Sequence, residues 1–136
     1  FFQTPLSSEG KKALAAAAIV LDKDTVSPGD IQAPTGFIHA YDLTRLLISA
    51  SKQTAFTGNT KEDRRQLKTQ LETLEGKTLG LIKMYQRPFS SYTQDKPDAH
   101  EALNIHDFVM AKYDDLGNIH LIKQGFTNTE DSLNGR

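Results

Sequence analysis

The 136-residue sequence contains no cysteine. Without cysteine the chain cannot form a disulfide framework, hold zinc through thiolates or use a thiol nucleophile. It also has no excess of charge of either sign, because 16 basic and 17 acidic residues give a formal net charge of -1. A protein without a positive field has little to attract phosphate backbones or anionic lipids. We therefore expect no nucleic-acid partner.

Long hydrophobic runs are missing too, since the longest one extends from Ala13 to Leu21 and a membrane helix needs about 20 residues. The chain opens on Phe1-Phe2-Gln3, without an initiator methionine or a readable signal peptide. Termini are usually polar and mobile, so an apolar pair in first position is typical of a buried strand. We expect one domain at this length, as a fragment of a longer protein.

Three segments have the composition or spacing of helices. The first, Lys11 to Asp22, follows an N-cap candidate at Ser7-Ser8 and an acid at Glu9. Its alanine-rich and leucine-rich composition predicts a core helix that is covered on more than one side. Two successive turn signals then predict a loop from Asp24 to Gly36.

The second and third helices are predicted from apolar spacing. Phe37 to Lys52 places four apolar residues on one face, and its other apolar residues imply deep burial. Thr60 with Asp63 resembles a capping box that starts a surface helix, and Gly76 stands where a helix C-cap needs a positive φ. The apolar positions are Leu43, Leu46, Leu47 and Ala50 in the second helix, and Leu67, Leu71 and Leu74 in the third.

The remaining sequence favours strands. Thr78 to Met84 is a short apolar run that predicts one strand, and residues 87–99 are mostly loop. Ile105 to Tyr113 and Ile119 to Ile122 flank a turn at residues 114–118, which predicts a hairpin. Residues 124–136 are polar and predict a poorly ordered tail. Three helices followed by a strand and a hairpin, without βαβ alternation, indicate a truncated α/β fold. The sheet that these helices cover would come from residues outside the chain, or from a partner.

Several stretches in collinear order resemble the branched-chain amino acid, amide and urea group of type I periplasmic solute-binding proteins. Each motif is weak alone, and their shared order over residues 1–122 makes the resemblance moderately specific. Residues 92–99, an insertion, and residues 54–60 depart from the family pattern. The matching stretches are Ala33 to Leu47, Asp63 to Leu74, Tyr85-Gln86-Arg87-Pro88-Phe89-Ser90, His100-Glu101-Ala102-Leu103, and Met110 to Tyr113 with Gly117-Asn118-Ile119.

This resemblance implies the C-terminal part of a type I periplasmic-binding-protein fold. Residues 1–6 would be a hinge crossover, residues 7–76 helices of the first lobe, residues 77–122 strands that cross to the second lobe, and residues 123–136 a polar tail. The parent protein would be periplasmic and would bind a small polar solute, such as an amino acid or amide, without a cofactor. Its partners would be the membrane subunits of an ABC importer and the remainder of its own chain. A regulator that uses the same fold to control a partner protein is the alternative.

Candidate ligand contacts lie at the start of the second predicted helix. Phe37, Ile38, His39 and Tyr41 follow a flexible loop, where an aromatic wall for a ligand can be built. Packing in a core is the competing interpretation, because aromatic residues at helical spacing usually lie there. Asp42 is equally suited to capping the helix.

The four histidines predict no catalytic or metal site. His39, His100, His106 and His120 include no pair at the i, i+4 spacing of zinc hydrolases, and the sequence has no Gly-x-Ser-x-Gly elbow. His106-Asp107 would be the natural orienting pair of a small hydrolase, which is the least favoured alternative.

Two charged segments are more ambiguous. The mixed run Lys61 to Arg65 is typical of a solvated helix end. Lys83 and Arg87 flank a loop with Tyr85, Phe89 and Tyr92, which could stack an acidic or aromatic ligand. A hinge-side surface is the preferred interpretation of that loop.

Overall fold

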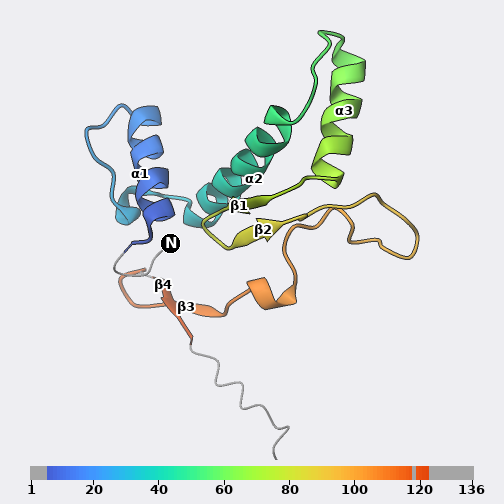
Figure 1. The fold of residues 1–136 in the computed structure, drawn as a ribbon. Helices are drawn as coiled ribbons and strands as arrows, with labels where there is room; N and C mark the ends of the chain where they lie inside the picture. The colour runs from blue at the N-terminus through green and yellow to red at the C-terminus, as the bar shows by residue number, and fades with distance from the viewer. Residues whose placement is uncertain (1–5, 118, 123–136) are drawn as a thin grey trace, which may run out of the picture. The chain divides into compact units, whose positions relative to one another are not determined.

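The computed structural model describes residues 6–117 and 119–122, which belong to two compact units, Phe1–Leu103 and Asn104–Arg136. Within these described residues, the first unit holds three α-helices and a two-stranded sheet, and the second holds a two-stranded hairpin (Figure 1). The mixed α/β composition is therefore confirmed. The predicted hinge, apart from Leu6, and the predicted tail at residues 123–136 lie outside the described residues.

Helix α1 spans Ser8–Val20 and is capped as predicted. The Ser7 hydroxyl accepts a hydrogen bond from the Gly10 amide at 3.0 Å, and Glu9 lies in the first turn. Ile19 and Val20 have exposed fractions of 83% and 84%, so the prediction of a helix covered on more than one side is wrong. Apart from the carboxylate of Glu9, the buried side of the helix consists of small residues and one leucine, namely Gly10, Ala13, Leu14, Ala17 and Ala18.

Helix α2 spans Pro34–Lys52 and follows a loop that contains a short 3-10 turn, η1, at Pro28–Asp30. It starts before the predicted Phe37 because proline is favoured in the first turn, where its missing N–H would have no helical partner. Leu46 and Ala50 are buried, as predicted.

The predicted apolar face of α2 is only partly correct. Leu43 and Leu47 are exposed, although they were expected to share the buried face with Leu46. The buried stripe runs instead through Asp42, Leu46 and Ala50, at successive steps of four residues. This stripe faces the hairpin formed by β1 (Lys77–Leu79) and β2 (Met84–Gln86), where the Asp42 carboxylate accepts its hydrogen bonds.

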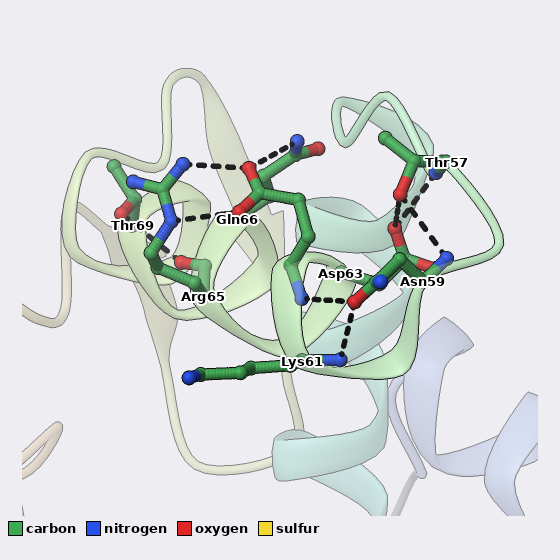
Figure 2. Close-up of polar contacts among 8 residues, drawn as sticks. Thr57, Asn59, Lys61, Asp63, Arg65, Gln66 and Thr69 are labelled. Carbon is green, nitrogen blue, oxygen red and sulfur yellow. Dashed lines mark hydrogen bonds and ion pairs between the residues drawn. The ribbon is translucent and has the colours of Figure 1, made fainter.

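Helix α3 spans Thr60–Glu72, and its cap is Asn59 instead of the predicted Thr60. The Asn59 side-chain oxygen accepts hydrogen bonds from the amides of Lys61 and Glu62, each at 3.1 Å (Figure 2). Asparagine is among the best N-cap residues because its short side chain reaches these unpaired amides.

Asp63 has a different role from the one expected in a capping box. Its carboxylate accepts hydrogen bonds from the Thr57 amide and hydroxyl at 2.7 and 2.8 Å, and from the Gly58 amide at 3.1 Å. These hydrogen bonds hold the pKa of Asp63 below its ordinary value, and the bond from the Thr57 amide contributes most. Asp63 therefore closes the loop before α3 onto the helix.

The charged run at the start of α3 is paired within the helix. The Arg65 guanidinium donates two hydrogen bonds to Glu62, at 2.6 and 3.1 Å, and these bonds lower the pKa of Glu62 to about 2. Arg65 is exposed, and Glu62 is only partly covered. The solvated helix end expected from the sequence is thus present.

The run from Thr78 to Met84 forms a hairpin, so the prediction of one strand is wrong. β1 spans Lys77–Leu79 and β2 spans Met84–Gln86, and they pair antiparallel with Thr78 opposite Tyr85. The Gly80 amide donates to the Lys83 carbonyl at 2.9 Å and closes the turn. Gly76 has the predicted positive φ, +82°, but it lies beyond the helix C-cap at Thr73 and leads into β1.

The core of the first unit is small and lies where α2, α3 and the hairpin meet. Thr78 connects the sheet to α2 through a hydrogen bond to the Ser49 hydroxyl at 3.1 Å. The buried residues of this core are Leu46, Ala50, Leu74 and Tyr85, with Leu67, Leu71, Phe89, Ala102 and Leu103 packed against them.

The second unit confirms the predicted hairpin, with shorter strands. A 3-10 turn, η2, spans Ile105–Asp107, and β3 at Ala111–Tyr113 pairs antiparallel with β4 at Ile119–Leu121. The predicted strand segment at residues 108–110 lies outside β3, and its side chains are exposed. None of the described helices in either unit has the length and apolar character needed to cross a membrane.

Candidate functional site

Two of the four predicted ligand contacts come together on α2. Phe37 and Tyr41 are separated by four residues, so they lie on the same side of the helix. Their rings are tilted by 31°, their centroids are 6.4 Å apart, and both side chains are half-buried. The structure therefore provides an aromatic pair at the start of α2.

The other two predicted contacts are placed differently. Ile38 is half-buried, whereas His39 is exposed. His39 is two residues from both Phe37 and Tyr41, which is about 200° around the axis of an α-helix. His39 therefore points away from the side of α2 that carries the aromatic pair.

A buried carboxylate from α1 lies beside the aromatic pair. Glu9 is only 2% exposed, and its Oε1 accepts a hydrogen bond from the Tyr41 hydroxyl at 2.8 Å. Arg45 Nε lies 3.4 Å from the same oxygen, and Lys12 Nζ lies 3.2 Å from Oε2. We call Glu9, Phe37, Tyr41 and Arg45 the α1–α2 cluster.

The pKa values in this cluster reflect burial and hydrogen bonding. Burial alone would raise the pKa of Glu9, but the hydrogen bonds from Tyr41 and Lys12 outweigh it and hold that pKa below its ordinary value. Burial raises the pKa of Tyr41, and the bond to Glu9 raises it further. Glu9 is therefore ionised and Tyr41 is a neutral donor near neutral pH.

Sequence reasoning missed two members of the cluster, Glu9 and Arg45. Arg45 stands four residues after Tyr41 and eight after Phe37, so helical spacing could have placed it in the same stripe. Its side chain is 41% exposed, while Nε is buried and has no hydrogen-bond partner within the described part of the chain. Glu9 could not have been found in this way, because 32 residues separate it from Tyr41.

The cluster can bind a ligand by packing and hydrogen bonding. Aromatic side chains beside a few fixed polar groups are characteristic of small-molecule sites. A guanidinium is suited to carboxylates because its N–H groups match the two carboxylate oxygens. The Glu9 carboxylate pairs with the buried Nε of Arg45, and the rest of the Arg45 side chain remains partly exposed at the surface.

Replacing Tyr41 with phenylalanine should lower the free energy of unfolding, because the Glu9 carboxylate then loses the hydrogen bond from the Tyr41 hydroxyl. The folded-state pKa of Glu9 lies below 4.5, so its contribution is present above about pH 4.5 and is lost as pH falls through the folded pKa. Losing a hydrogen bond to a buried carboxylate costs about 1.5–3 kcal/mol. Urea unfolding at several pH values between about 3 and 7 measures both effects.

Glu9→Gln is the matched control for this experiment. It removes the titrating group, so the dependence of unfolding free energy on pH should be flatter than in the unchanged protein. An unfolding free energy that is the same at pH 7 with tyrosine and with phenylalanine at position 41 would contradict the role assigned to this hydrogen bond.

Asp42 anchors the hairpin instead of capping α2. It lies in the third turn of the helix, is 3% exposed, and accepts hydrogen bonds from the Leu81 amide, from the Ile82 amide at 3.0 Å and from the Tyr85 hydroxyl at 2.8 Å. The interpretation of Asp42 as a helix cap is therefore wrong. Its neighbour Gly80 is buried directly against the carboxylate.

The other histidines lie in separate places along the chain. His100 Nε2 lies 2.9 Å from Glu72 Oε1, and in the second unit His120 Nε2 lies 2.9 Å from Asp114 Oδ2. Asp107 accepts a hydrogen bond from the Asn104 amide, as part of the cap of η2. Within residues 6–117 and 119–122, no group of three or more histidines and acids is placed to hold a metal ion.

The loop around Lys83 and Arg87 does not present the stacking surface that was the less favoured of its two interpretations. Tyr85 is 3% exposed and belongs to the core, and Phe89 packs against it. Lys83 Nζ lies 5.5 Å from the centroid of the Tyr85 ring. Tyr92 is exposed and Phe89 is half-buried, so the three aromatic residues do not form one open surface.

A polar cleft of about 320 Å³ lies between residues 53–55, which follow α2, and residues 65–70 of α3. Gln70 on α3 donates a hydrogen bond to Gln53 at 3.0 Å across it. Figure 2 shows three of its lining residues that lie on α3, Arg65, Gln66 and Thr69. Apart from the methyl of Ala55, its lining side chains carry amides, hydroxyls and one guanidinium, from Gln53, Thr54, Arg65, Gln66, Thr69 and Gln70. No sequence signal pointed to this cleft.

No family model matches the chain, and neither a curated protein nor a solved structure matches it.

Proposed function

We propose that this chain is part of a two-lobed solute-binding protein of a periplasmic ABC importer. It would bind a small polar solute, such as an amino acid or an amide, without breaking or forming a covalent bond. The observation that carries this proposal is the α1–α2 cluster, in which the Phe37–Tyr41 ring pair lies beside the Glu9–Arg45 ion pair. Such a combination of an aromatic surface and fixed charges suits a small solute.

In this proposal the cluster contributes one wall of the binding site. The partly exposed Arg45 would pair with a carboxylate or carbonyl of the solute. The half-buried rings of Phe37 and Tyr41 would pack against its apolar part. The second lobe would close over the solute and exclude water, as in hinge-closing receptors.

Two further observations support the proposal. The motifs that resemble solute-binding proteins follow one another in the family's order, from Ala33 to Ile119. Apolar side chains on the helices of the first unit are exposed, which fits surfaces that another part of a larger protein covers. Examples are Ile19 and Val20 on α1 and Leu43 and Leu47 on α2.

Ligand screening of the full-length protein by thermal shift tests this function. Amino acids, urea and short amides form the panel, and a ligand at a hundred times its dissociation constant should stabilise the protein by about 2.7 kcal/mol. We expect a raised melting temperature with at least one member. A flat response across the whole panel would count against the proposal.

Two variants locate the site once a ligand is found. Phe37→Ala should weaken binding about tenfold or more, because truncating an aromatic anchor of a binding site costs about 2 kcal/mol or more, and about 1.4 kcal/mol corresponds to tenfold. His39→Ala is the matched control, since His39 is exposed on another side of the same helix and should leave the dissociation constant within about twofold. Titration calorimetry measures both. Equal affinities for the two variants would exclude the α1–α2 cluster as the binding wall.

A further inference from the structure

The buried Glu9 carboxylate of the α1–α2 cluster is paired with two cations. Its Oε2 accepts a hydrogen bond from Lys12 Nζ at 3.2 Å, and its Oε1 lies 3.4 Å from Arg45 Nε. The Lys12 side chain is 66% exposed and that of Arg45 is 41% exposed, whereas that of Glu9 is 3% exposed. The acid is therefore enclosed within the cluster, and the two cations reach the surface.

The guanidinium of Arg45 keeps its hydrogen-bonding capacity. A guanidinium has five N–H donors, and none of those on Arg45 donates a hydrogen bond to another residue in the part of the chain that the structure describes. Nε is buried beside Glu9, so the N–H groups of the two terminal nitrogens are the ones that a ligand can reach. Two parallel N–H groups of this kind match the two oxygens of a carboxylate.

The charges at this place favour an anion. Lys12 and Arg45 face the single carboxylate of Glu9, so two positive charges meet one negative charge. Asp42 is the other acid that acts on this region of α2. It is 3% exposed, and its carboxylate is occupied by two backbone amides of the hairpin and by the Tyr85 hydroxyl. Asp42 is thus satisfied on the hairpin side, and an excess of positive charge remains at the cluster.

We infer that the solute of this site carries a carboxylate, which Arg45 binds through paired N–H groups while Lys12 adds a second positive charge. The inference rests on the proposed function and narrows its class of solute to anions. A carboxylate presents acceptors at both oxygens, whereas a primary amide presents one acceptor and one NH₂ donor. That NH₂ group would face the donors of Arg45, so the site should reject the amide.

The aromatic pair defines the other end of the solute. Phe37, Tyr41 and Arg45 follow one another at steps of four residues and lie on the same side of α2. The rings of Phe37 and Tyr41 are half-buried, with centroids 6.4 Å apart. An apolar substituent next to the carboxylate would pack against them.

Two pairs of probes that differ in a carboxylate and an amide test this inference. They are 4-methylpentanoate with 4-methylpentanamide, and L-leucine with L-leucinamide. In each pair that binds, titration calorimetry of the full-length protein should show about tenfold or more tighter binding of the acid. Equal affinities, or tighter binding of the amide, would overturn the inference and leave the proposed function standing. If neither these probes nor the wider panel bound, the proposed function itself would fail, and this inference with it.

The variant Arg45→Gln tests the residue that makes the distinction. Glutamine lacks both the charge and the planar fork of arginine, so the ratio of acid to amide affinity should fall to about one. A change that only disturbed the fold would weaken both probes and keep the ratio. An unchanged ratio in Arg45→Gln would exclude Arg45 as the group that binds the carboxylate.

Lys12→Gln should lower the same ratio by a smaller factor, about two- to threefold, because the charge of an exposed side chain is screened. Lys11→Gln is the matched control. Lys11 is also exposed on α1, and no ion pair joins it to another described residue. It should leave the ratio as in the unchanged protein. Equal ratios for the two lysine variants would remove Lys12 from the site.

Discussion

Replacing Asp42 with alanine should lower the free energy of unfolding by about 3 kcal/mol or more. The change leaves the amides of Leu81 and Ile82 and the hydroxyl of Tyr85 without their acceptor. Each buried donor that loses its partner costs about 1–3 kcal/mol. Urea unfolding followed by circular dichroism measures the loss, and faster hydrogen exchange at Leu81 and Ile82 would locate it.

Two other substitutions on α2 serve as controls. Asp42→Asn keeps one oxygen acceptor, so its free energy of unfolding should lie between those of the unchanged protein and the alanine variant. Thr44→Ala changes an exposed position on the same helix and should alter stability by less than about 0.5 kcal/mol. If Asp42→Ala were as mild as Thr44→Ala, Asp42 would not anchor the hairpin.

The second large effect is expected for Gly80→Ala. A Cβ atom at this position would lie 2.5 Å from Asp42 Oδ2 and 2.6 Å from Tyr85 Cε2. Both neighbours are buried and are bonded to each other, so neither can move without breaking a contact. Overpacking of this kind typically costs about 1–3 kcal/mol, which urea unfolding can resolve.

Gly36→Ala is the matched control for this substitution. Gly36 lies in the first turn of α2, and apart from its chain neighbours and the adjoining helix backbone nothing lies within 4 Å of the position where its Cβ would be built. Alanine is favoured over glycine in helices by up to about 1 kcal/mol, so this variant should be unchanged or slightly more stable. Equal stabilities for the two alanine variants would show that the space around Gly80 is not limiting.

Local sequence signals predicted the helices well. Each of these signals depends on residues within two turns of one another. They are the cap at Ser7, the apolar spacing of Leu46 and Ala50, and the stripe of Leu67 and Leu71. Such signals are present in a single sequence because helical contacts are short in range. The same holds for the second-unit hairpin, whose turn residues join its two strands directly.

Contacts between distant residues account for what was missed. The run from Thr78 to Met84 has the composition of one strand, and it folds back because a carboxylate on α2 binds the amides at its centre. Glu9 likewise reaches Tyr41 from another helix. In the candidate site, helical spacing could reveal Phe37, Tyr41 and Arg45, but their acidic partner is set by tertiary packing.

The bonds between Asp42 and the hairpin also bear on the order of folding. They join residues that are 39, 40 and 43 positions apart, and closing a chain segment of this length costs conformational entropy before any bond forms. Helical turns form locally and fast, whereas contacts of high sequence separation slow folding. We therefore expect α2 to form early and the β1–β2 turn to reach its final geometry late, when helix and hairpin meet.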